Sequence, residues 1–153
     1  MRAPGTGVVA PMATITAELL DNYRIDITNG RHTWRADEPT DFGGDDTGPN
    51  PYDLLLGSLA ACTTITLAFY AKRKGIDLTS VSAEYSFDRI HADDCELCDG
   101  ELEGMIDRVT SRIFIDGDFD EATRTRLQEV AVRCPVHKTL AAGVVFEETV
   151  FAG

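Results

Sequence analysis

Apolar and polar residues alternate near the start of the chain. The alternation covers residues 15–19 and 23–27 and returns at 32–34, a pattern that predicts three short β-strands. Asn29-Gly30 stands between the last two, and this dipeptide favours the tight turn of a β-hairpin. Turn-forming residues then dominate positions 41–50. The sequence therefore predicts an N-terminal antiparallel meander followed by a loop.

An uncharged apolar stretch of 18 residues runs from Leu54 to Ala71. Asn50 before Pro51 is a typical helix start, and the basic residues 72–74 followed by Gly75 are a typical helix end. One helix is therefore predicted from Pro51 to about Lys74. Its length is near the lower limit for a membrane span. Because glycine, serine and threonine interrupt the stretch, we expect a fully buried core helix instead.

The second half of the chain predicts two longer strands, over residues 81–90 and 105–115, with a polar, acidic loop between them. A second helix is predicted to begin at residues 118–121 and to end near Cys134, because Pro135 disfavours helical angles in the residue before it. Residues 144–150 predict a last short strand. We therefore expect a flexible extension over residues 1–12 and one α+β domain over 13–153, with antiparallel sheet packed on two main helices.

The charge balance bears on the partners. The formal net charge is -12 and the sequence pI is about 4.5, which disfavours nucleic acid and anionic membranes as partners. The apolar run at residues 8–10 is too short for a signal peptide, so we expect a cytoplasmic location. In that reducing compartment, four cysteines indicate redox chemistry or metal binding more than structural disulfides.

Two cysteines lie on predicted helices. Cys62 stands in the middle of the long helix, where an inert, packed thiol is the ordinary interpretation. A reactive thiolate there requires a cation supplied by the tertiary structure. Cys134 stands at a helix end, where a simple packing role is the alternative to a mobile, reactive thiol. The sequence does not show whether the two residues meet.

The other two cysteines, Cys95 and Cys98, form a CxxC pair in the acidic loop, with His91 shortly before them. These three residues are compatible with zinc binding if His137 or Cys134 completes the ligand set. A dithiol redox role and a purely structural role are the alternatives. The acidic neighbours are expected to raise the pKa values of both thiols.

Two segments resemble a known family. Residues 48–63, GPNPYDLLLGSLAACT, and residues 133–140, RCPVHKTL, are similar to the two cysteine motifs of the OsmC/Ohr family, the osmotically inducible and organic hydroperoxide resistance proteins of bacteria. The resemblance covers roughly residues 14–150 and includes the loop from Asp94 to Cys98, which is typical of one subgroup. It implies the OsmC-like α+β fold and an intertwined homodimer with active sites at the subunit interface.

The resemblance also implies a chemistry. It makes Cys62 the peroxidatic cysteine, which reduces an organic hydroperoxide and becomes a sulfenic acid, and Cys134 the resolving cysteine, which condenses with it to a disulfide. The family's active-site arginine corresponds to Arg24, with Arg31 as the second choice. Where the family has a glutamate, this chain has Tyr52, with Asp53 beside it.

Substrate and reductant follow from the same resemblance. Tyr52, Asp53 and Leu59 are the expected substrate-binding residues, and the apolar helix around Cys62 favours alkyl hydroperoxides. A dithiol, in the family a lipoylated protein or similar, is the expected reductant. No cofactor or metal is expected, and we expect the CxxC loop to be dispensable for peroxide turnover.

Two other functions remain open on the same fold. The first is a non-catalytic, thiol-based stress or binding protein, with zinc at the CxxC loop, and Tyr52 in the glutamate position favours it. The second is a redox-regulated partner of another enzyme.

Overall fold

The computed structural model of the chain describes residues 10–98 and 100–153, which divide into two compact units, Met1–Asp53 and Leu54–Gly153. Most of the extension expected over residues 1–12 lies outside the described residues, and residues 10–12 are exposed. The single domain over 13–153 stays a prediction.

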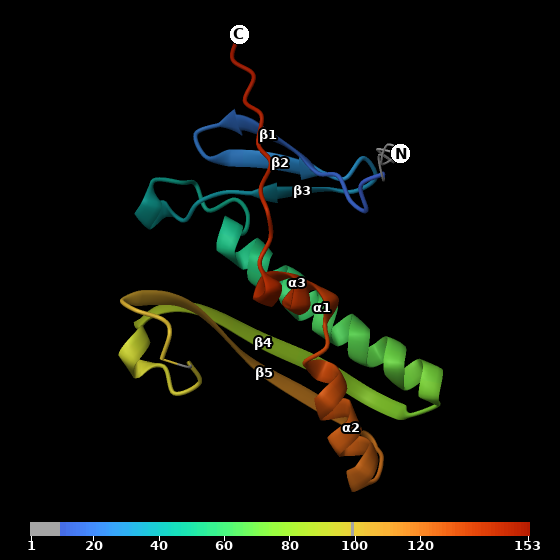
Figure 1. The fold of residues 1–153 in the computed structure, drawn as a ribbon. Coiled ribbons are helices and arrows are strands. Elements are labelled where there is room, and N and C mark those ends of the chain that lie inside the picture. Colours follow the sequence, from blue (N-terminus) through green and yellow to red (C-terminus); the bar gives the residue numbers. More distant parts are fainter. Residues whose placement is uncertain (1–9, 99) are drawn as a thin grey trace, which may run out of the picture. The chain divides into compact units, whose positions relative to one another are not determined.

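The Met1–Asp53 unit is built on a three-stranded antiparallel sheet in the order β1 (Thr16–Asp21), β2 (Arg24–Thr28) and β3 (Thr33–Ala36), as Figure 1 shows. This confirms the predicted meander. In the turn between β2 and β3, the Asn29 side-chain oxygen accepts the backbone N–H groups of Arg31 at 3.0 Å and His32 at 2.7 Å. Gly30 takes the positive φ of 83° that a side chain would resist.

A loop with one short 3₁₀ helix, η1 (Thr40–Phe42), follows the sheet and folds back on it. It is held by Asp37, which is 2% exposed. One Asp37 carboxylate oxygen accepts both the backbone N–H of Thr47, at 3.1 Å, and its hydroxyl, at 2.6 Å. Gly44 passes so close to Glu38 that an added Cβ would lie 1.8 Å from the Glu38 carbonyl oxygen. The loop therefore needs a glycine at that position.

The long helix α1 (Pro51–Lys74) has the predicted bounds. Its first turn is closed by a reciprocal pair: the Asn50 side-chain oxygen accepts the N–H of Asp53 at 2.9 Å, and the Asp53 carboxylate accepts the N–H of Asn50 at 3.1 Å. Both bonds satisfy N–H groups that lack a partner within the helix. Asp53 thus serves the start of the helix.

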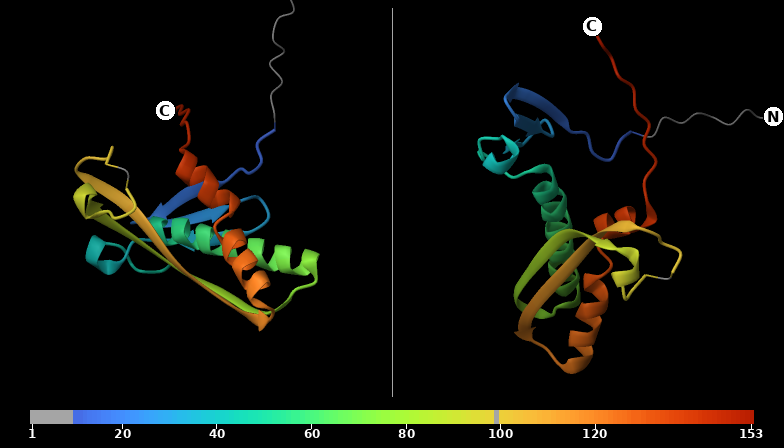
Figure 2. Two further views of the ribbon diagram at one scale, coloured as in Figure 1. Left: turned by 60° about the horizontal axis from the view of Figure 1, so that its bottom comes forward. Right: turned by 90° about the vertical axis from the view of Figure 1, so that its left-hand side faces the viewer.

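The Leu54–Gly153 unit contains a long antiparallel hairpin of β4 (Asp77–His91) and β5 (Met105–Asp118), joined by a loop with the 3₁₀ helix η2 (Ala92–Asp94). Both predicted strands are present and are longer than expected. The helices α2 (Glu121–Ala131) and α3 (Pro135–Ala142) follow, and Figure 2 shows α2 beside the twisted hairpin.

The core of this unit joins α1 to α2 over the hairpin. Leu67 and Leu127 are fully buried and pack with Val130 and Ala131. Apolar residues of β4, β5 and their connections cover this cluster, namely Val81, Ile113, Ile115, Ile76 and Phe119, together with Tyr70 of α1. Val81 of β4 and the α2 residues Leu127, Val130 and Ala131 thus lie on the faces that pack.

Two sequence predictions are wrong within this chain. The long helix is not buried all round: its buried residues lie on one stripe, Leu59, Thr63, Leu67 and Ala71, while Ile65 and Phe69 are 67% and 66% exposed. Residues 144–150 form no strand, because none of the described strands pairs with them, and Val145 and Phe146 are 92% and 77% exposed.

Two features of the helices bear on the predictions: where α2 ends, and whether α1 could cross a membrane. The second helix, α2, ends at Ala131, before the predicted end near Cys134, and Pro135 lies in the first turn of α3, a helix that the sequence did not predict. By length and composition alone α1 could cross a membrane, a test that the core helix of a soluble protein also passes.

Candidate active site

Cys62 and Cys134 meet inside the Leu54–Gly153 unit. Cys134 is the N-cap of α3, and its sulfur accepts the backbone N–H of His137 at 3.5 Å. The two thiols lie close enough together that each shifts the pKa of the other. Cys134 is fully buried, whereas Cys62 is half-buried. Residues from the middle of α1 and the start of α3 therefore form one dithiol pair.

The surroundings of the two sulfurs favour ionisation of Cys134. Burial opposes its ionisation, but hydrogen bonds from the Cys62 thiol, from the backbone N–H of His137 and from the Thr63 hydroxyl together lower the pKa of Cys134. Burial raises the pKa of the Cys62 thiol, and its bond to Cys134 raises it further.

A hydrogen bond to Tyr85 holds Thr63, the residue that follows Cys62. The hydroxyl of Thr63, a residue with no exposed surface, lies 2.8 Å from the phenol oxygen of Tyr85 on β4. Neither residue is among the site residues predicted from the sequence. The available signals were the position of Thr63 directly after Cys62 and the position of Tyr85 on the inward-facing alternation of its strand.

A cavity of about 300 Å³ lies beside His137, the residue whose backbone N–H donates to the Cys134 sulfur. Leu59, one helical turn before Cys62, lines it together with His137 and Leu140 of α3. The hairpin contributes Tyr85, Asp107, Val109 and Ser111. Leu59 is thus placed where an alkyl group could lie. Ile65 and Phe69, by contrast, lie on the exposed side of α1.

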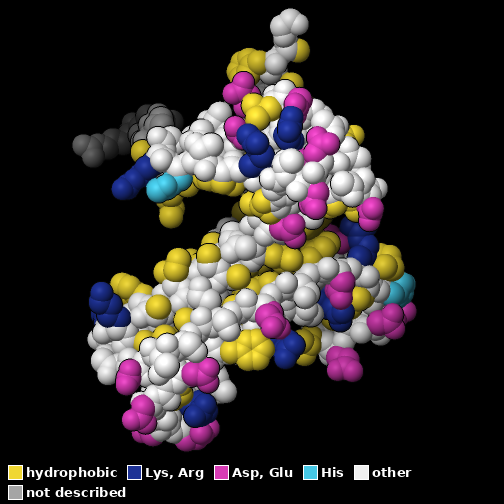
Figure 3. Space-filling view, turned by 180° about the vertical axis from the view of Figure 1, so that it is seen from behind, with side chains coloured by type: hydrophobic (Ala, Val, Ile, Leu, Met, Phe, Trp, Pro, Cys, Tyr) yellow, Lys and Arg dark blue, Asp and Glu magenta, His cyan; other side chains and the backbone are white. Residues whose placement is uncertain are grey.

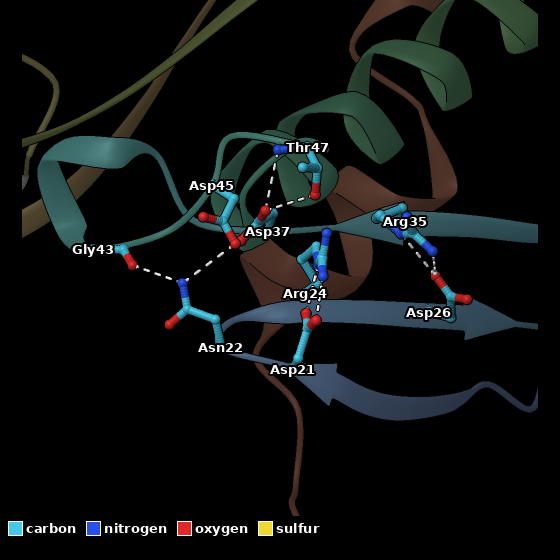
Figure 4. Close-up of polar contacts among 9 residues, drawn as sticks. All are labelled: Asp21, Asn22, Arg24, Asp26, Arg35, Asp37, Gly43, Asp45 and Thr47. Atoms are coloured by element: carbon cyan, nitrogen blue, oxygen red, sulfur yellow. Dashed lines mark hydrogen bonds and ion pairs between the residues drawn. The ribbon is translucent and has the colours of Figure 1, made fainter.

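The remaining predicted residues belong to the Met1–Asp53 unit. Arg24 of β2 donates its Nε–H to the Asp21 carboxylate at 2.5 Å and makes a second bond to the other oxygen (Figure 4). The guanidinium group lowers the pKa of the Asp21 carboxyl. Arg31, the second choice, is exposed in the β2–β3 turn.

Tyr52 and Asp53, which precede Cys62 in the sequence and were predicted to bind substrate, have different environments. Asp53 is engaged in the start of α1 by its bonds with Asn50. Tyr52 is 52% exposed. The roles of Arg24, Tyr52 and Asp53 in a reaction stay predictions.

The CxxC pair is a disulfide: the sulfurs of Cys95 and Cys98 are bonded to each other. Both sulfurs that zinc binding would require are therefore bonded to each other, and Cys134 lies beside Cys62. Among the described residues, no group of three or more His, Cys, Asp and Glu side chains could hold a metal ion.

Comparison with known proteins identifies the family. The family model described as OsmC-like protein matches residues 43–149, so the chain belongs to the OsmC-like family. A search of the curated proteins by sequence found no match.

Solved structures confirm the fold. An OsmC-like protein from Mycoplasma pneumoniae has a TM-score of 0.65 and 21% identity, over 87% of this chain and 89% of that one. The organic hydroperoxide resistance protein OhrB of Bacillus subtilis has a TM-score of 0.55 and 22% identity, over 85% and 90%. An organic hydroperoxide resistance protein from Legionella pneumophila has a TM-score of 0.58 and 20% identity, over 85% and 89%.

Proposed function

We propose that this protein is a cytoplasmic thiol peroxidase that reduces organic hydroperoxides with Cys62 and Cys134. The observation that carries the proposal is the proximity of the two thiols, which belong to distant parts of the sequence and shift each other's pKa. Two thiols in contact can pass from sulfenic acid to disulfide without a large movement of the chain. Membership of a family that includes proteins named for organic hydroperoxide resistance supports the substrate class.

In the first step the Cys62 thiolate attacks one oxygen of the hydroperoxide. The O–O bond breaks, the sulfur is oxidised to sulfenic acid, and the alkoxide takes up a proton and leaves as an alcohol. Cys62 is assigned this step because it is half-buried, whereas Cys134 has no exposed surface for a peroxide to reach.

This assignment requires a cation, because burial and Cys134 both raise the pKa of the Cys62 thiol. We assign that part to Arg24, whose guanidinium group stays protonated and can stabilise both the thiolate and the negative charge on the leaving oxygen. The cavity beside Leu59 is the proposed site for the alkyl group.

In the second step Cys134 attacks the Cys62 sulfenic acid, the S–O bond breaks, and water leaves with the proton. The groups that lower the pKa of Cys134 suit it to this step, because the thiolate is the nucleophile. An external dithiol then reduces the disulfide and is itself oxidised to a disulfide.

Single substitutions of the two cysteines test the assignment. Cys62→Ser is expected to abolish turnover of cumene hydroperoxide. Cys134→Ser is expected to consume about one equivalent and stop, leaving a sulfenic acid that forms a dimedone adduct at Cys62 and over-oxidises with excess peroxide. Wild-type protein should show a Cys62–Cys134 disulfide by peptide mass spectrometry. A dimedone adduct on Cys134 in Cys62→Ser, with continued turnover, would reverse the two roles.

We further propose that the protein acts as a homodimer. The surface of the Leu54–Gly153 unit carries many exposed apolar side chains (Figure 3), among them Ile65 and Phe69 of α1 and Phe146 and Phe151 near the C-terminus. Exposed apolar surface of this kind typically marks an interface. In a homodimer the apolar surfaces of the two copies would cover each other.

A further inference from the structure

We propose that Cys95 and Cys98 form a second, independent thiol–disulfide exchange site, which reacts through Cys95 with neutral or cationic dithiols and discriminates against anionic thiols such as glutathione. The juxtaposition behind this proposal is a half-buried disulfide beside an open, acid-lined cavity at the tip of the β4–β5 hairpin. The proposal is independent of peroxide reduction.

The disulfide is poorly placed to act as a structural staple. It closes a loop with only two residues between the cysteines, which removes little entropy from the unfolded chain. The ends of the hairpin loop are already joined, because His91 pairs with Met105 in the β-ladder and the N–H of Ala92 donates to the Gly104 carbonyl at 2.7 Å. Reduction therefore leaves the hairpin held by its backbone bonds.

The cavity gives one of the two sulfurs access to a partner. It has a volume of about 480 Å³, and Cys95 is among its lining residues, whereas Cys98 is not. Leu97 at its edge is 98% exposed. An incoming thiolate that enters this space meets the Cys95 sulfur first.

The charges around the cavity set the selectivity. Asp94 and Glu96 line it, and the cation that also lines it, Arg108, is bonded to Asp88 at 2.8 and 2.5 Å. The Asp93 backbone N–H donates to Nδ1 of His91 at 3.3 Å. The carboxylates of Asp94 and Glu96 therefore repel an anionic thiol more than a neutral or cationic one.

The exchange transfers two electrons from the dithiol to the Cys95–Cys98 disulfide. One thiolate of the dithiol attacks the Cys95 sulfur, the Cys95–Cys98 bond breaks, and Cys98 leaves as a thiolate that takes up a proton. The second thiol of the same molecule attacks the mixed disulfide and releases Cys95. The dithiol loses two electrons and becomes a disulfide, and the protein gains two thiols.

The test measures reduction of this disulfide in the Cys62→Ser/Cys134→Ser protein, where Cys95 and Cys98 are the remaining cysteines. Thiols are trapped by alkylation and counted by mass, and rate constants are expressed per thiolate. We expect folded protein to be reduced by dithiothreitol, and cysteamine to react about tenfold faster than glutathione at low ionic strength, with a smaller difference in concentrated salt.

Two variants test whether the charge of Glu96 slows the reaction with glutathione. Glu96→Gln is expected to speed the reaction with glutathione, whereas Asp77→Asn, which removes the same charge at the opposite end of β4, should not change it. The same measurement on wild-type protein, with Cys95 and Cys98 resolved as peptides, replaces the double variant if that protein does not fold.

Three outcomes would overturn the proposal. They are resistance to dithiothreitol until the chain unfolds, loss of the folded circular dichroism signal on reduction, and equal rates for cysteamine and glutathione. None of them bears on peroxide reduction, because the tested protein lacks Cys62 and Cys134.

Discussion

The buried hydroxyl of Thr63 lies 2.8 Å from the phenol oxygen of Tyr85 and also lowers the pKa of the nearby Cys134 thiol. A hydroxyl has one proton to donate and two lone pairs to accept with, so Thr63 can donate to the sulfur while it accepts from Tyr85. Through this bond β4 fixes the residue next to Cys62 and supports the thiolate form of Cys134.

Thr63→Val should therefore raise the pKa of Cys134, because the valine side chain cannot donate to the sulfur. It should also lower the free energy of unfolding by about 1–3 kcal/mol, since the Tyr85 phenol loses its partner. The pKa is measured from the pH dependence of the ¹³Cβ chemical shift of Cys134 in isotope-labelled protein. Thr63→Ser, which keeps the hydroxyl, should keep the pKa of Cys134 near its wild-type value. A profile unchanged in Thr63→Val would exclude the proposed support.

Arg24→Gln should reduce kcat/KM for an alkyl hydroperoxide by about 10²–10³, because the substitution removes the positive charge proposed to stabilise the developing anion. Arg35→Gln is the matched control: Arg35 also lies in this sheet and also pairs with an aspartate, Asp26 at 2.9 Å. It should change kcat/KM little. If Arg31→Gln shows the large loss and Arg24→Gln does not, the assignment passes to Arg31.

Asp37 predicts a pH dependence of stability. Hydrogen bonds from Thr47 lower the pKa of its carboxyl below the ordinary 3.8. A lowered folded-state pKa gives stability that is present above the unfolded value and is lost as the pH falls through the folded value. Urea unfolding, followed by the single tryptophan, Trp34, should therefore show Asp37→Asn less stable than wild type at pH 7.

The difference between Asp37→Asn and wild type should shrink as the pH approaches 3. Asp41→Asn, at an exposed position in the same loop, is the control and should resemble wild type throughout. A difference that stays constant with pH would show that the charge of Asp37 contributes no stability.

The proposed homodimer predicts a melting temperature that rises with protein concentration, because association stabilises the folded state by mass action. Phe69→Glu should weaken association by placing a charge in the apolar surface of α1. Lys74→Gln changes the net charge by the same amount at the end of that helix and should remain dimeric. Analytical ultracentrifugation distinguishes the two. A wild-type monomer at about 10 µM, well above the dissociation constant of an obligate dimer, would contradict the proposal.

Local chemistry determined the secondary structure in advance. The bounds of α1 follow from Asn50 at its start and from the basic residues and Gly75 at its end, and the β2–β3 hairpin follows from Asn29-Gly30. These signals act over a few residues, so they can be read from the sequence alone. The resemblance of the two cysteine motifs added the family and the fold.

Contacts between distant residues were decided only by the tertiary structure. Two contacts depend on how α1, β4 and α3 pack: the approach of Cys62 to Cys134 and the hydrogen bond between Thr63 and Tyr85. No short-range pattern encodes that packing. The same limit explains both wrong predictions. Apolar patterning predicts that α1 and residues 144–150 are covered, but it does not say what covers them. Burial depends on the surface that comes to lie against a segment, and that surface belongs to another part of the fold or to a second chain.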